Sequence, residues 1–124
     1  MEHEEFNKLL NEILKRTTNV LANKSVEYST KSDKLHNFKR AGRMLGCSPE
    51  KALIGMWTKH IVSILDIVDE LEFKCGGTNL NCFPSLDPNE YVGTVEEKIG
   101  DAINYLILLE ALIKERKRKV EVYD

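Results

Sequence analysis

Apolar residues recur at steps of three and four along most of the chain, which is the spacing of one face of an α-helix. Residues 3–23 show this pattern with Lys, Glu and Asn between the apolar positions, and they predict a first, amphipathic helix. Residues 23–34 are polar and lose the pattern. A short helix is predicted over Leu35–Leu45, with Asp33 as a capping residue before it and Gly46 at its end.

Two longer helices are predicted in the second half of the chain. The first begins at Ser48-Pro49, because serine is a favoured N-cap and proline suits the first helical position, and it continues to about Phe73. A long loop over Lys74–Gly93 separates it from the last helix, Thr94–Val122, whose start is predicted from a capping box of Thr94 with Glu97.

The last predicted helix is apolar almost all the way round from Ala102 to Ile113, where Glu110 is the only charge. A helix without a broad polar face is normally buried on several sides. The sequence therefore predicts an all-α bundle of about four helices in a single domain spanning 1–124, and long apolar faces on so small a chain indicate a homo-oligomer.

Composition narrows the function classes. With 42% hydrophobic and 31% charged residues the chain has the balance of a soluble globular protein. A net charge of −2 and basic residues without interleaved aromatics make nucleic acid an unexpected partner. No apolar run approaches membrane-spanning length and no signal peptide is recognisable, so we expect no membrane association and a cytoplasmic location.

Three cysteines are an odd number in a chain expected to lie in a reducing compartment. Free thiols are therefore the expectation for Cys47, Cys75 and Cys82. A disulfide between Cys75 and Cys82 is expected only in an oxidising setting, and their spacing is not that of a zinc site.

The candidate chemistry begins with acidic residues on the two long helices. Glu97, Asp101 and Asn104 fall within about 80° of one another on the last helix, at its increasingly apolar section. If the two helices pack antiparallel, Asp66 on the preceding helix is expected at about the same height along the helix axes as Asp101. Converging carboxylates suit Mg²⁺, which prefers oxygen ligands. The competing interpretations are that Glu97 serves only as a capping residue and that Asp66 belongs to a solvent-facing stripe.

Basic and aromatic residues supply further candidates. Asn37, Lys39 and Arg40 belong to a basic segment that could hold phosphate through charge-assisted hydrogen bonds, or could be a solvated helix face. Lys59 and His60 could likewise meet phosphate, or satisfy polar contacts within the bundle. Tyr105 is a core residue or a surface on which a base stacks.

The run Glu97–Tyr105, with the sequence EKIGDAINY, resembles the last-helix motif of the all-α nucleoside triphosphate pyrophosphohydrolases, the MazG and dimeric dUTPase superfamily. It is more similar still to small phage and prophage proteins of the nucleotide-modification-associated group, as are Lys24–Tyr28, Asp33–Phe38 and Lys59-His60. The resemblance implies a helical, usually oligomeric protein that acts on or binds nucleotides with a divalent ion, in the host cytoplasm if it is phage-encoded.

The residue patterns and the resemblance together give candidate roles to two groups of residues. The ion, with Mg²⁺ expected, and the catalysis are assigned to Asp66, Glu97 and Asp101. The substrate is assigned to Glu27, Asn37, Lys39, Arg40, Lys59, His60, Asn104 and Tyr105. The chain departs from the hydrolase pattern, because Lys98 stands where that pattern has a glutamate and Lys59, His60, Ser63 and Asp66 replace its paired glutamates.

Three hypotheses follow. The first is a phage-type, Mg²⁺-dependent enzyme that releases pyrophosphate from a nucleoside triphosphate. The second is a non-catalytic protein that binds and sequesters a nucleotide or a nucleotide-derived signal, as a counter-defence protein would. The third is a purely structural helical oligomer.

Overall fold

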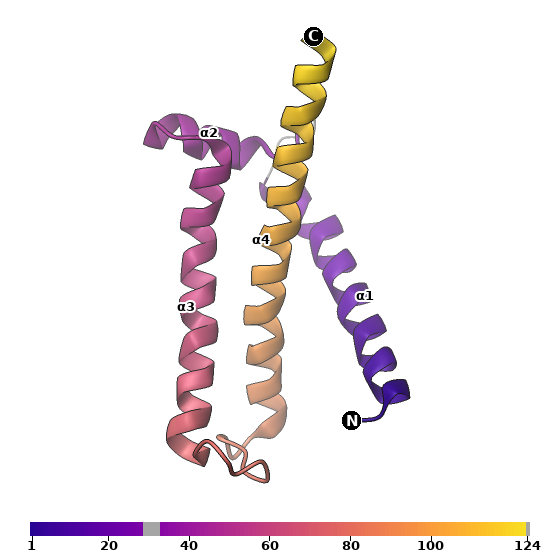
Figure 1. The fold of residues 1–124 in the computed structure, drawn as a ribbon, viewed down its shortest axis with the longest axis vertical. Helices are drawn as coiled ribbons and strands as arrows, with labels where there is room; N and C mark the ends of the chain where they lie inside the picture. The colour runs from indigo at the N-terminus through magenta and orange to yellow at the C-terminus, as the bar shows by residue number, and fades with distance from the viewer. Residues whose placement is uncertain (29–32, 124) are drawn as a thin grey trace.

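The computed structural model of the chain describes residues 1–28 and 33–123, with the side chains of residues 24–28 and 123 left aside. Four helices follow one another, and the described residues contain no β-strand beyond an isolated bridge position at Asp33 (Figure 1). The all-α architecture predicted from the sequence is confirmed. The helices are α1 (His3–Tyr28), α2 (His36–Leu45), α3 (Pro49–Cys75) and α4 (Pro88–Tyr123).

Local capping explains where α2 ends and where α3 begins. The Ser48 hydroxyl accepts a hydrogen bond of 3.1 Å from the Lys51 amide, so the predicted start of α3 is confirmed. Gly46 adopts the left-handed conformation, with φ of 70°, immediately after α2. The Asp33 carboxylate accepts from the Leu35 amide at 2.9 Å in the turn before α2, but the N-cap residue of α2 is Leu35, without a side-chain cap, so the predicted Asp33 cap is wrong.

The start of α4 differs from the prediction. The helix begins at Pro88, and the Asp87 carboxylate caps it by accepting a hydrogen bond of 3.2 Å from the Glu90 amide. Thr94 lies inside the helix, where its hydroxyl donates to the Glu90 carbonyl, so the predicted capping box is wrong. Helix α1 also continues past the predicted end at residue 23, because the polar residues beyond it contain no helix breaker.

The cysteine expectation is only partly correct. Cys47 carries a free thiol, whereas Cys75 and Cys82 form a disulfide that joins the end of α3 to the following loop. This pairing arises because α3 extends to Cys75 and the loop folds back, which brings the two Cα atoms to 5.4 Å.

Helices α3 and α4 form a long antiparallel hairpin, α2 crosses the start of α3, and α1 leans on α4 and diverges from it toward the N-terminus (Figure 1). The buried core is small and lies where α2, α3 and the second half of α4 meet. Its central residues are Leu35, Phe38, Leu53 and Leu112. None of the described helices combines the length and apolarity needed to cross a bilayer.

Ion pairs fasten α2 and the start of α3 to the last turns of α4. The Lys39 ammonium lies between the carboxylates of Asp33 and Glu115, and Arg116 donates two hydrogen bonds to Glu50, of 2.9 and 2.8 Å. The hydrogen bond from Lys39 lowers the pKa of Asp33 and that of Glu115. Burial disfavours the Lys39 cation, but the two carboxylates outweigh it and raise the pKa of Lys39.

Substituting Lys39 by methionine should lower the free energy of unfolding by about 1–3 kcal/mol at pH 7, since two partly buried carboxylates lose a charged donor. Because the carboxyl pKa values are depressed in the folded state, this stabilisation is present above about pH 5 and is lost as the pH falls. Urea unfolding at pH 7 and pH 3 measures both effects.

The matched control is Lys114→Met, which removes a pair with Glu110 in which both side chains are 71% exposed. Its effect should stay below about 0.5 kcal/mol. Equal losses for the two variants, or a Lys39→Met loss that does not shrink at pH 3, would show that the partly buried ion pairs of Lys39 stabilise the fold no more than an exposed pair does.

Candidate functional site

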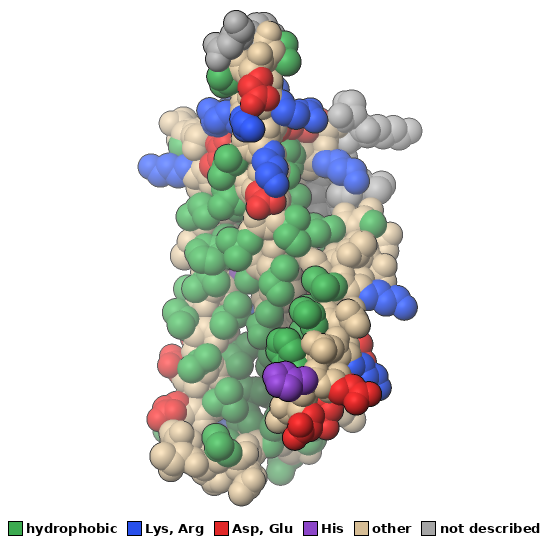
Figure 2. Space-filling model, turned by 45° about the vertical axis from the view of Figure 1, so that its right-hand side comes forward, with side chains coloured by type: hydrophobic (Ala, Val, Ile, Leu, Met, Phe, Trp, Pro, Cys, Tyr) green, Lys and Arg blue, Asp and Glu red, His purple; other side chains and the backbone are tan. Residues whose placement is uncertain are grey.

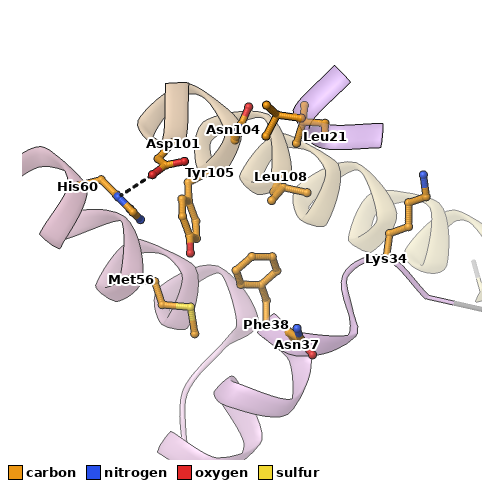
Figure 3. Close-up of a pocket in the computed structure, with 11 residues that line it drawn as sticks. Leu21, Lys34, Asn37, Phe38, Met56, His60, Asp101, Asn104, Tyr105 and Leu108 are labelled. Atoms are coloured by element: carbon orange, nitrogen blue, oxygen red, sulfur yellow. Dashed lines mark ion pairs between the residues drawn. The ribbon is translucent and has the colours of Figure 1, made fainter. Parts of the chain in front are cut away.

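A cavity of about 340 Å³ lies among α2, α3, α4 and the end of α1 (Figure 3). Its apolar lining comes from Val20 and Leu21 of α1, Met56 of α3 and Leu108 of α4. All four helices contribute to this lining, so the cavity depends on how α1 and α2 pack against the α3–α4 hairpin.

Three rings form one wall of the cavity. The ring centroid of Tyr105 lies 6.0 Å from that of Phe38, in an edge-to-face arrangement, and 4.9 Å from that of His60, whose ring is tilted by 33°. Each ring comes from a different helix, so the wall is assembled only when α2, α3 and α4 pack together. Such a wall offers an incoming planar group both ring faces and ring edges.

Charged and polar groups lie next to these rings. The His60 Nδ1 atom is 3.8 Å from an Asp101 carboxylate oxygen, and the two side chains are only 18% and 22% exposed (Figure 3). Their interaction is an ion pair when the imidazole is protonated. The 3.8 Å separation is longer than a hydrogen bond.

Asn104 carries an unusual polar atom. Its Oδ1 is buried and has no hydrogen-bond partner among the described residues. A buried carbonyl oxygen without a hydrogen-bond partner lowers the stability of the folded protein, so a hydrogen-bond donor at this position would be stabilising. Lys34 and Asn37 lie at the other side of the cavity, near the start of α2, and add a cation and a second amide (Figure 3).

A second concavity of about 260 Å³ lies between α1 and α4, beside the first. Asp101 and Asn104 line both, and Glu97 lines only the second. On the α1 side the wall includes Arg16, whose guanidinium is 3.5 Å from the Glu96 carboxylate, and Thr17, a buried polar residue.

The structure brings several of the sequence-predicted residues together and leaves others apart. Those that line the main cavity are Asn37, His60, Asp101, Asn104 and Tyr105.

The remaining predicted residues lie elsewhere. Lys39 is held in the ion pairs described above. Lys59, Arg40 and Asp66 are exposed and line neither concavity. His60 lies opposite Asp101, and Asp66 follows His60 by six residues, which is about 9 Å along α3 and a rotation of about 240°. Asp66 is therefore neither level with Asp101 nor directed toward the cavity, and the predicted match in level is wrong. The Glu27 side chain lies outside the described residues.

The predicted metal ligands were tested against this arrangement. Glu97 and Asp101 are one helical turn apart on α4 and line the same concavity, together with Asn104. Asp66 does not join them. In the parts of the chain that the structure describes, there is no group of three or more His, Cys, Asp or Glu side chains placed to hold a metal ion. The three-acid site expected from the resemblance is therefore not assembled from these residues.

Sequence reasoning did not single out several residues of the cavity. Phe38 and Met56 read as ordinary core positions, as did Leu108, and Lys34 was one of many basic residues. The available signal was spacing for Met56, which precedes His60 by four residues, or about one helical turn, and so lies on the same face of α3.

In comparisons with protein-family models, curated proteins and solved structures, nothing matches this chain. The assignment of a function therefore rests on the residues and geometry of the cavity itself.

Proposed function

We propose that the chain binds a nucleotide or a nucleotide-derived small molecule in the main cavity and that binding itself is its function. The observation that carries this proposal is the wall of three rings, Phe38, His60 and Tyr105, beside a cation and two amides. The cavity volume of about 340 Å³ falls at the lower end of the range of small-molecule sites, about 300–1,000 Å³.

Each group has a part in this proposal. The base stacks on the ring of Tyr105 or His60, an interaction that any base can make. Amides both donate and accept hydrogen bonds, so Asn37 and the unpartnered oxygen of Asn104 form hydrogen bonds with polar groups of the base or the sugar. Lys34, at the exposed edge, meets a phosphate by a charge-assisted hydrogen bond. The resemblance noted from the sequence points to the same class of ligand.

The test uses a panel of ribo- and deoxyribonucleoside mono-, di- and triphosphates, titrated into the protein by calorimetry, with and without Mg²⁺. Tyr105→Ala should weaken binding of the retained nucleotide about tenfold or more, because base stacking is worth about 1–3 kcal/mol. Tyr91→Ala is the matched control, since Tyr91 lies on the same helix but stacks on Phe83, outside the cavity. Absence of binding across the panel, or equal losses in both variants, would contradict the proposal.

A second candidate is the metal-dependent pyrophosphohydrolase. It is favoured by one observation, the presence of Glu97, Asp101 and Asn104 along one concavity, because carboxylates and amide oxygens are ligands that Mg²⁺ takes together with water. The same panel, assayed for released pyrophosphate, distinguishes the candidates. Mg²⁺-dependent release that Asp101→Asn abolishes would support hydrolysis, and retention without product supports binding alone.

A further inference from the structure

Helix α4 carries an exposed row of large apolar residues at seven-residue intervals. Val92, Ile99, Leu106, Ile113 and Val120 have exposed fractions of 43, 40, 47, 53 and 54%. A step of seven residues returns to within about 20° of the same side of a helix, so these five residues form one stripe about 42 Å long. We name this stripe the α4 seam.

The α4 seam is separate from the cavity. Leu106 lies about 140° around the helix axis from Asp101 and about 160° from Leu108, both of which line the cavity. Figure 2 shows hydrophobic side chains in a broad band along the length of the molecule, with Lys and Arg gathered near its C-terminal end. An apolar band of this extent, on helices unsuited to a bilayer, indicates a protein interface.

The exposed area of the chain is too large for a monomer of its size. A compact protein of 14.2 kDa exposes about 6,800 Å², whereas this chain exposes 9633 Å², an excess of about 2,800 Å². Obligate dimers bury about 2,000–5,000 Å² in total, or about 1,000–2,500 Å² per chain. The excess is therefore enough for a stable interface with a second chain.

The pattern of the α4 seam indicates which partner covers it. A row of apolar residues at seven-residue steps keeps to one side of a helix, so it can pack along its whole length against the same row of a second copy. It is also symmetric, because Ile99 and Ile113 lie at equal steps on either side of Leu106, as do Val92 and Val120. A twofold axis through Leu106 would place Ile99 of one copy against Ile113 of the other.

Charge favours the antiparallel orientation. The first half of α4 carries Glu90, Glu96 and Glu97, and its last turns carry a run of Lys and Arg from Lys114 to Lys119. Antiparallel pairing places each acidic half near the basic half of the other copy, whereas parallel pairing places like charges together. We propose that the α4 seam packs antiparallel against the α4 seam of a second copy of this chain, with Leu106 at the twofold axis.

The first test is the molecular mass in solution, measured by light scattering after size exclusion at about 50 μM. The wild-type chain should have at least twice the mass of a single chain, and Leu106→Glu should be monomeric, with its helicity by circular dichroism retained. Leu86→Glu is the matched control, because Leu86 is a fully exposed loop leucine and its loss should leave the mass unchanged. A monomeric wild type, or an associated Leu106→Glu variant, would overturn the proposal.

The second test is disulfide crosslinking in a Cys47→Ser background, and it also decides the outcome if Leu106→Glu does not fold. Leu106→Cys should crosslink to itself. Ile99→Cys should crosslink when mixed with Ile113→Cys and not with itself. Self-crosslinking of Ile99→Cys would overturn the antiparallel orientation, and failure of Leu106→Cys to crosslink would overturn the α4 seam as the interface.

Discussion

Replacing Leu53 by alanine should lower the free energy of unfolding by about 2–5 kcal/mol, the range for large-to-small substitutions in a packed core. Leu53 has no exposed surface and lies among Leu35, Phe38 and Leu112, so it contacts all three elements that meet there. The buried core is small, and alanine would leave a void that few neighbours can fill. The loss would be a large fraction of the total stability of a domain of this size.

Urea unfolding monitored by circular dichroism measures this loss. All variants are compared at one protein concentration, because self-association would shift the urea midpoint of unfolding. Leu86→Ala is the control, since Leu86 is fully exposed in the loop and its truncation should change the free energy by less than about 0.5 kcal/mol. A Leu53→Ala loss below about 1 kcal/mol would mean that the three helices do not meet as described.

Gly42→Ala should destabilise the protein by about 1–3 kcal/mol although alanine is the better helix former. A Cβ at Gly42 would lie 2.8 Å from the Cys47 carbonyl oxygen and 3.0 Å from the Pro49 nitrogen. Both are backbone atoms of the turn that joins α2 to α3, so neither can rotate away. The substitution would push α2 off the start of α3 and disturb the side of the cavity that α2 provides.

The matched control is Gly55→Ala, within α3, where nothing lies within 4 Å of the added Cβ. This variant should be as stable as the wild type or more stable by up to about 1 kcal/mol, from helix propensity alone. Thermal and urea unfolding of the two variants side by side give the comparison. If Gly42→Ala also stabilises the protein, α2 does not approach the following turn as closely as the structure has it.

Much of the fold could be predicted from hydrophobic spacing and capping residues. Ser48-Pro49 located the start of α3, and Gly46 the end of α2, because each is a local signal tied to a backbone conformation. The start of α4 was missed because two capping signals compete in this region. The structure uses Asp87-Pro88, and the residues predicted as a loop up to Gly93 form nearly two turns of helix.

The candidate site was predictable only in part, and the reason is geometrical. Asp101 was found from its helical spacing with Glu97 and Asn104, whereas His60 and Tyr105 were named from the resemblance and from the chemistry of their side chains. Asp66 was matched to Asp101 by its expected height along an antiparallel hairpin, but His60 lies opposite Asp101, which places Asp66 about 9 Å further along α3. The part that α2 provides, with Phe38, depends on how α2 crosses the hairpin, and this crossing is not encoded in local spacing.

Phe38 and Lys39 are adjacent in the chain, yet one lines the cavity and the other holds α2 to the end of α4 through Asp33 and Glu115. A guest that requires even a small displacement of α2 must therefore strain ion pairs outside the cavity. Intact ion pairs would oppose any binding event that displaces α2, and acid or salt that weakens these pairs would reduce that opposition. The anchoring of α2 to the end of α4 therefore sets how rigid this side of the cavity is.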